Sequence, residues 1–166
     1  VWIIGEDIVQ TDPNSAHVVQ AMNSLELLVV QEIFMSETAK LATVVLPGTT
    51  FLEKNGTFTN TERRIQRVNQ AVPPLPGTKT DGMIVTDMMQ KLGFDQPTYD
   101  ADQVLAEIAD IVPFFKGVTR ERLGKMGLQW PVQEDGTDTQ ILHKETFKLG
   151  KGRLKNFDWK ESTEIE

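Results

Sequence analysis

Three short apolar runs set the fold: residues 1–4 read VWII, residues 27–30 read LLVV and residues 43–46 read TVVL. Continuous apolar runs of this length are typical of strands that are buried on both faces of a parallel sheet. Helices are expected between them, over residues 13–25 and over residues 36–41, where Ser36 supplies a cap. This alternation predicts right-handed strand–helix–strand units, and therefore an α/β domain.

The first of these helices carries its own start signal and its own buried face. Asp12-Pro13 predicts an N-cap followed by proline at the first helical position. Val18, Met22 and Leu25 follow at spacings of one helical turn, so they share one side of the helix. We expect that side to pack against the sheet.

The rest of the chain divides into a polar loop, a helical part and a charged end. Residues 48–77 contain a tight turn at 54–57 and a proline-rich connector, and they predict a long functional loop. Three later helices are expected: from Thr80 to Leu92, from Asp100 to the residue before Pro113, and from Thr119 to Met126. Residues 131–166 hold eight acidic and six basic side chains and one strand-like run at 140–143, which is typical of a connector.

Composition excludes several classes of function. The 166 residues carry a formal net charge of −7, which argues against a nucleic-acid or anionic-membrane surface. No stretch approaches the ~20 apolar residues of a membrane span. With no cysteine and two histidines, these residues offer no disulfide, no thiolate nucleophile, no cysteine-ligated iron–sulfur cluster and no multi-histidine metal site.

Polar residues follow each predicted strand, where ligands of open α/β sheets bind. The first strand is followed by Glu6-Asp7, the second by Gln31-Glu32 and the third by Pro47-Gly48-Thr49. A carboxylate there can accept hydrogen bonds from a guanine edge or a ribose diol, and free N–H groups at a helix start favour an anion. The alternative is that Asp7 and Glu32 are helix caps or surface groups.

Three further charged groups have both a binding and a structural interpretation. Lys54 lies before Asn55-Gly56, where a cation can reach a phosphate or simply be solvated in a turn. Asp81 opens a helix and is either a ligand contact or a first-turn acid. Arg63-Arg64 beside Glu62 favours a structural ion-pair cluster. No nucleophile–base–acid set and no glycine-rich phosphate loop is present, so the residues alone predict a binding domain without catalytic residues and without metal ligands.

Long motifs in a fixed order then carry a resemblance. They are GED (5–7), LVVQEIF (28–34) with ETA (37–39), TVVLP (43–47), EKNGTFTNTERRIQR (53–67), KTD (79–81), GLQWP (127–131) and ILH (141–143). Together they resemble the catalytic subunit of molybdopterin oxidoreductases, in the branch of formate dehydrogenases and periplasmic nitrate reductases. The resemblance covers nearly the whole chain.

The resemblance implies a fold and a set of cofactor contacts. The fold implied is a Rossmann-like three-layer domain with a mostly parallel sheet, in which residues 1–130 form part of the domain that binds one molybdopterin guanine dinucleotide. Residues 131–166 would connect to a C-terminal domain. By motif position, the implied contacts are Glu6, Asp7, Gln31, Glu32, Lys54 and Asp81. Relatives usually have aspartate where Glu32 stands and often asparagine where Asp7 stands.

The resemblance also implies what the parent protein does. The expected parent oxidises formate to carbon dioxide, using molybdenum or tungsten held by two such dinucleotides. Its iron–sulfur cluster and metal ligand would lie outside this chain, so the fragment alone is not expected to be active. The expected partners are the remainder of the subunit and an electron-transfer subunit or NAD-linked diaphorase. The alternatives are a nitrate reductase of the same family and a non-catalytic interaction module; a cytoplasmic location is expected, with a periplasmic one left open.

Overall fold

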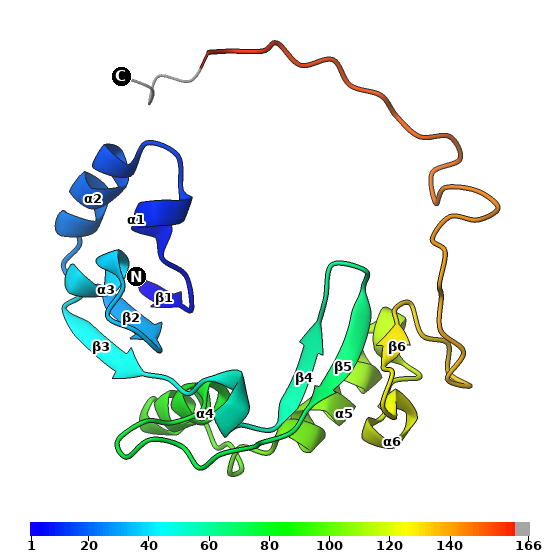
Figure 1. Cartoon of the computed structure of the whole chain (residues 1–166), viewed down its shortest axis with the longest axis horizontal. Helices are drawn as coiled ribbons and strands as arrows, with labels where there is room; N and C mark the ends of the chain where they lie inside the picture. The colour runs from blue at the N-terminus through cyan, green and yellow to red at the C-terminus, as the bar shows by residue number, and fades with distance from the viewer. Residues whose placement is uncertain (162–166) are drawn as a thin grey trace.

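Two small sheets, joined by helices, form an open arc in a computed structural model that describes residues 1–161 (Figure 1). The first sheet is parallel and has the strand order β1-β2-β3. In it, Trp2 pairs with Val29, and Val29 pairs with Val44. Its elements are β1 (Trp2–Ile4), α1 (Ile8–Thr11), α2 (Ser15–Asn23), β2 (Val29–Glu32), α3 (Glu37–Lys40) and β3 (Val44–Pro47). The predicted parallel α/β unit is therefore confirmed. The expected burial of all three strands on both faces is not: Val30 is buried, whereas Ile4 and Val44 are 48% and 43% exposed.

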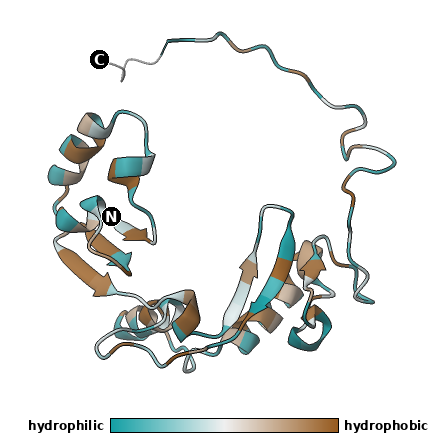
Figure 2. Cartoon of the chain, in the orientation of Figure 1, coloured by the Kyte–Doolittle hydropathy of each residue, from teal (hydrophilic) through white to brown (hydrophobic). Residues whose placement is uncertain are grey.

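The second sheet is antiparallel and has the order β4-β5-β6. It was not expected from the sequence, where residues 48–77 predicted a loop and the sheet was expected to be mostly parallel. The elements are η1 (Phe51–Glu53), β4 (Gly56–Thr59), β5 (Arg64–Val68), α4 (Asp81–Lys91), α5 (Ala101–Ile111), η2 (Pro113–Phe115), α6 (Arg120–Leu123) and β6 (Leu128–Gln129). Figure 2 shows β3 brown and β5 largely teal, since β5 reads RIQRV and has only Ile65 buried. Such a polar strand has a weak sequence signal.

Each sheet has its own core. In the parallel part, the buried residues are Ile3, Leu28, Val30 and Ala39, with Met22 and Leu25 of the predicted helix face packed against them. In the antiparallel part, the buried residues are Ile65, Leu105, Val118, Leu123 and Val132. The two clusters share no residue, so each sheet belongs to a separately packed region. Figure 1 shows α4 between the two sheets.

Several predicted boundaries hold and two are corrected. Ser36, Thr80, Asp100 and Thr119 are the N-caps of their helices, as predicted. Asp12 is not the predicted N-cap but the C-cap of α1. Helix α2 begins after Asn14, whose side chain accepts a hydrogen bond from the His17 backbone N–H at 3.3 Å. The second strand begins at Val29, which pairs with Trp2, and reaches Glu32, which pairs with Pro47 of β3.

The end of the chain has little secondary structure. Residues 140–143 form a turn and not the strand-like run expected from their pattern, because they have no neighbouring strand to pair with. Val132 is buried in the core of the antiparallel part, so packed structure continues past Trp130. The expected connector includes residues 162–166, which lie outside the described residues. None of the helices between residues 1 and 161 is long and apolar enough to cross a bilayer.

Candidate functional site

Asp81 joins three parts of the chain at the carboxyl end of the parallel sheet. Its Oδ1 accepts a hydrogen bond from Gln31 Nε2 at 2.8 Å, and its Oδ2 forms an ion pair with Lys54 Nζ. Gln31 lies in β2, Lys54 directly precedes the β4–β5 hairpin, and Asp81 is the first residue of α4. Three of the six predicted site residues are therefore in direct contact.

Local capping explains why Asp81 and Lys54 lie where they do. The Thr80 side chain accepts a hydrogen bond from the Met83 backbone N–H, which starts α4 and leaves Asp81 in its first turn. Glu53, which is 8% exposed, accepts hydrogen bonds from the Thr50 N–H and hydroxyl at 2.8 and 2.9 Å. It also accepts one from the Leu75 N–H at 2.9 Å. Glu53 thereby fixes the turn that presents Lys54.

The acidity of these carboxyl groups follows from their partners. Partial burial acts to raise the pKa of Asp81, but the hydrogen bonds from Lys54 and Gln31 outweigh it and hold the pKa below its ordinary value. Hydrogen bonds from the backbone and hydroxyl of Thr50, and then from Leu75, lower the pKa of Glu53. Asp81 is therefore a carboxylate near neutral pH and an acceptor of hydrogen bonds.

Two buried polar atoms in these loops have no partner within residues 1–161. Gln31 is 1% exposed and its Oε1 accepts no hydrogen bond, because its amide nitrogen faces Asp81. Thr49 is 2% exposed and its hydroxyl is also unpartnered. Gly48, which precedes Thr49, lies so close to Asp81 that a Cβ added at Gly48 would be 3.3 Å from Asp81 Oδ1. Buried polar atoms normally have partners, so this end of the sheet has unused hydrogen-bonding capacity.

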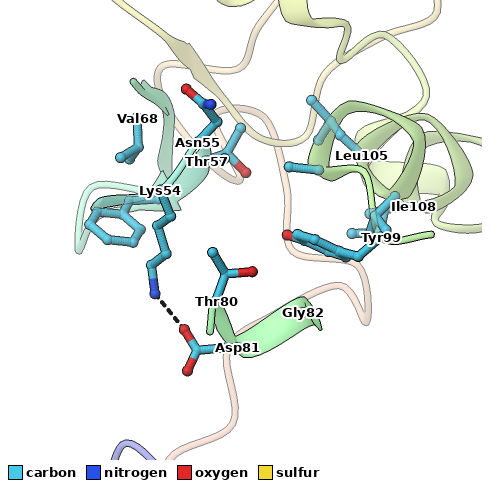
Figure 3. A pocket seen from close by; sticks show the side chains of 14 residues that line it. Lys54, Asn55, Thr57, Val68, Thr80, Asp81, Gly82, Tyr99, Leu105 and Ile108 are labelled. Atoms are coloured by element: carbon cyan, nitrogen blue, oxygen red, sulfur yellow. Dashed lines mark hydrogen bonds and ion pairs between the residues drawn. The ribbon is translucent and has the colours of Figure 1, made fainter. Parts of the chain in front are cut away.

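A cleft of about 220 Å³ opens beside the ion pair, between the hairpin and α5. Figure 3 shows Lys54 and Val68 on one side of it, Tyr99, Leu105 and Ile108 on the other, and Thr80 and Asp81 at one end. Tyr99 was not singled out from the sequence. Its ring packs on the start of α4, and burial, followed by the charge of Asp81, raises its pKa. No motif or periodicity marks a lone tyrosine in a loop.

Glu32 lies beside this junction but does not contact it. Its Oε1 accepts a hydrogen bond from the Ile33 backbone N–H at 2.7 Å, and its backbone carbonyl accepts one from the Gly48 N–H at 3.0 Å. The half-buried carboxylate is thus held at the end of β2, next to the loop that carries Gly48.

Glu6 and Asp7 occupy the loop after β1, and their contacts are local. Glu6 accepts a hydrogen bond from the Thr11 hydroxyl at 2.6 Å. Asp7 Oδ1 accepts from the Thr38 N–H and hydroxyl at 2.9 and 2.7 Å, which lowers its pKa and ties α3 to the loop. Gly5 connects this loop to the site through its N–H, which donates to the Gln31 carbonyl at 2.9 Å. Asp7 therefore accepts hydrogen bonds from backbone N–H groups in the first turn of α3, whose N-cap is Ser36.

The adjacent arginines have separate structural roles. Arg64 Nε pairs with Glu62 at 3.0 Å, as the predicted ion-pair cluster requires. Arg63 turns the other way: its guanidinium donates to the carbonyls of Trp130, Thr139 and Gln140 and lies 5.8 Å from the Trp130 ring centroid. Among residues 1–161, no three His, Cys, Asp or Glu side chains are grouped so as to hold a metal ion.

The first 91 residues of the chain match a known protein family. Residues 1–91, more than half of the chain, match the family model described as molybdopterin oxidoreductase. The chain belongs to the molybdopterin oxidoreductase family. The matched region contains all six predicted contact residues. Gln31, Lys54 and Asp81, which meet at the junction, are three of them.

Curated relatives are similar in sequence to nearly the whole of this chain. The F420-dependent formate dehydrogenase subunit alpha of Methanocaldococcus jannaschii is 42% identical over 99% of this chain and 25% of the relative. A putative formate dehydrogenase of Staphylococcus aureus (strain bovine RF122) is 46% identical over 95% of this chain and 16% of the relative. The chain thus spans a quarter or less of the length of these relatives.

One solved structure is similar to this chain in fold. Acetylene hydratase from Pelobacter acetylenicus superposes with a TM-score of 0.58 at 18% identity, over 82% of this chain and 21% of that one. The mixed α/β fold, with one parallel and one antiparallel sheet, therefore corresponds to part of a larger protein.

Proposed function

We propose that this chain is part of the catalytic subunit of a formate dehydrogenase and that it binds the guanine end of a molybdopterin guanine dinucleotide. The observation that carries the proposal is the junction of Gln31, Lys54 and Asp81 at the carboxyl end of the parallel sheet. Ligands of open α/β sheets bind at this edge. The choice of formate rests on the names of the 42–46% identical relatives.

The side chains present fit the chemistry of a guanine nucleotide. A guanine edge offers two N–H donors, and the Asp81 carboxylate accepts bidentate bonds from such a pair. The unpartnered Gln31 Oε1 is a further acceptor, and Lys54 supplies a cation for a phosphate. Gly48 leaves space beside Asp81 that a larger residue would fill. Glu32, and Glu6 with Asp7 in the loop after β1, are proposed as outlying contacts of the same nucleotide.

The proposed domain organisation follows the family resemblance. Residues 1–130 form part of a Rossmann-like three-layer domain, and residues 131–166 connect it to a C-terminal domain of the same subunit. The burial of Val132 against Leu123 and Val118 indicates that the connector begins after a short packed stretch. The main partner is accordingly the remainder of the subunit.

The family implies a molybdopterin cofactor, whose metal, molybdenum or tungsten, would accept two electrons when formate becomes carbon dioxide. The residues described here bind and orient the nucleotide and take no part in the oxidation. An iron–sulfur cluster outside this chain, an electron-transfer subunit or NAD-linked diaphorase, and a cytoplasmic location are further parts of the proposal.

The test compares two aspartates of α4 in the full-length subunit. Asp81→Asn removes the negative charge and one of the two acceptor oxygens at the junction. Asp87→Asn removes a carboxylate that pairs with the exposed Lys79 and serves as the control. Guanine nucleotide released by denaturing the purified subunit is quantified by chromatography. Because a hydrogen bond to a charged group contributes about 1.5–3 kcal/mol, Asp81→Asn is expected to weaken nucleotide binding by about tenfold or more.

Three outcomes of this experiment are distinct. Loss of guanine nucleotide in Asp81→Asn, with full content in Asp87→Asn, supports the proposed contact. Equal nucleotide content in both variants contradicts the contact at Asp81. Absence of guanine nucleotide and formate-dependent dye reduction from the unmodified subunit contradicts the function as a whole.

A further inference from the structure

Helix α5 leaves most of its apolar surface uncovered. Of its eleven residues only Leu105 is buried, while Val104, Ile108 and Ile111 are 40%, 37% and 67% exposed. Their spacing of four and three residues places these three side chains along one line of the helix. A surface helix normally turns such an apolar stripe toward a packing partner.

The stripe continues into the cleft beside the candidate site. Val104 and Ile108 of α5 line that cleft together with Phe58 and Val68 of the hairpin. Figure 3 shows Ile108 and Val68 on opposite sides of it. Phe58 is 50% exposed, and its ring packs edge-on against Phe51 with centroids 6.2 Å apart. The apolar surface is therefore hollowed, and its walls come from two elements held by the same core.

The cleft has a polar end that belongs to the candidate site. Lys54 and Asp81 line it together with the apolar side chains, so a segment packed in the apolar part of the cleft lies next to their ion pair. Covering this end would exclude water and strengthen the electrostatic interactions of the junction. The apolar face and the nucleotide site are thus one continuous surface.

We propose that polypeptide of the same subunit, lying outside these 166 residues, packs its apolar side chains into this cleft between the hairpin and α5. Contiguous apolar surface of this kind marks an interaction site. The occupant follows from length: relatives 42–46% identical over nearly the whole chain are matched over only 16–25% of their own length, so most of each relative is available to cover it. This assignment rests on the proposed function, which makes the chain part of that subunit.

The experiment measures thiol accessibility in the full-length subunit. Ile108→Cys places a thiol on the stripe, and Gln103→Cys places one on an exposed, polar part of the same helix as the matched control. This chain contains no other cysteine, so labelling by a maleimide is assigned from the mass of the α5 peptide. In the native subunit we expect Ile108→Cys to label at least about tenfold more slowly than Gln103→Cys, because a buried thiol reacts only after local opening. Both should label fully in denaturant.

A second variant keeps the test informative if the cysteine perturbs folding. Val104→Asp is expected to lower the unfolding midpoint of the full-length subunit, since it places an unpaired charge in the proposed interface, whereas Gln103→Asp should leave it unchanged. Equal labelling of the two thiols in the native subunit overturns the proposal. Protection that disappears on dilution also overturns it, because the occupant is then a second copy. Guanine nucleotide content and formate-dependent dye reduction are measured separately on the unmodified subunit. If both are absent while Ile108→Cys is protected, the proposed function is contradicted and this interface still stands.

Discussion

Lys54 and Asp81 form an ion pair across 27 residues of sequence, and this contact connects the antiparallel hairpin to the start of α4. The second oxygen of the same carboxylate accepts a hydrogen bond from Gln31 of the parallel sheet. One half-exposed carboxylate therefore links the two separately packed regions of the chain. Because Asp81 contacts both regions, the geometry of the candidate site depends on the position of one region relative to the other.

The first prediction concerns the acidity of Asp81. In Lys54→Met, the hydrogen bond and the positive charge that lower its pKa are removed, while partial burial, which raises it, remains. The pKa of Asp81 should therefore rise, as measured by a carbon-detected NMR titration of that carboxyl group. Lys79→Met, which breaks the Lys79–Asp87 pair instead, is the control and should leave the pKa of Asp81 in place. An unaltered titration in Lys54→Met would show that the ion pair does not control this group.

The second prediction tests the contact between Tyr99 and the start of α4. A Cβ added at Gly82 would lie 2.0 Å from Tyr99 Cε2, so Gly82→Ala forces the ring away and should destabilise the chain by about 1–3 kcal/mol. In a Tyr99→Ala background the overlap is gone, and the same substitution should be neutral or stabilising by up to about 1 kcal/mol, because alanine favours helix. Urea unfolding of the four proteins measures both values. Equal effects in the two backgrounds would refute the contact.

The third prediction concerns Arg63, which has a φ of +66° and holds the segment after β6. Arg63→Ala loses three charge-assisted hydrogen bonds and keeps the unfavourable backbone angle, whereas Arg63→Gly loses the same bonds and relieves the angle. We expect both to destabilise the chain by about 1.5 kcal/mol or more, with alanine worse than glycine. Hydrogen exchange at the Thr139 amide, which donates to the Gln129 carbonyl, should accelerate in both. Unchanged protection there would mean that the segment is held by other contacts.

The fourth prediction is a dependence of stability on pH through Asp7. Its hydrogen bonds with Thr38 lower the folded-state pKa below the ordinary 3.8, so the native state binds the proton more weakly than the unfolded state. This contribution to stability is fully present above that ordinary value and is lost as the pH falls through the lowered folded pKa. In Asp7→Asn it is absent at every pH, so the fall in unfolding free energy between about pH 5 and pH 2 should be shallower than in the unmodified chain. Parallel pH profiles for the two proteins would contradict this role.

Local signals in the sequence were sufficient for the parallel part of the fold. The runs at residues 1–4, 27–30 and 43–46 predict where the three strands lie, and capping residues such as Ser36 and Thr80 predict where helices begin. These predictions succeed because hydrophobic burial and capping act within one element. The β4–β5 hairpin was missed because its strands are polar and short, and are stabilised by pairing and by the buried Ile65.

In the candidate site, too, the sequence determined some features and the tertiary structure determined others. The sequence by itself determined the family, the parallel strands and the acids and amide at their ends, because motif order and hydrophobic pattern are properties of the chain read in one dimension. Only the tertiary structure decided that Gln31, Lys54 and Asp81 meet, that Asp7 accepts hydrogen bonds from the first turn of α3, and that Tyr99 and α5 wall the adjoining cleft. Contacts between residues far apart in sequence depend on how separate elements pack, and no local pattern encodes that distance.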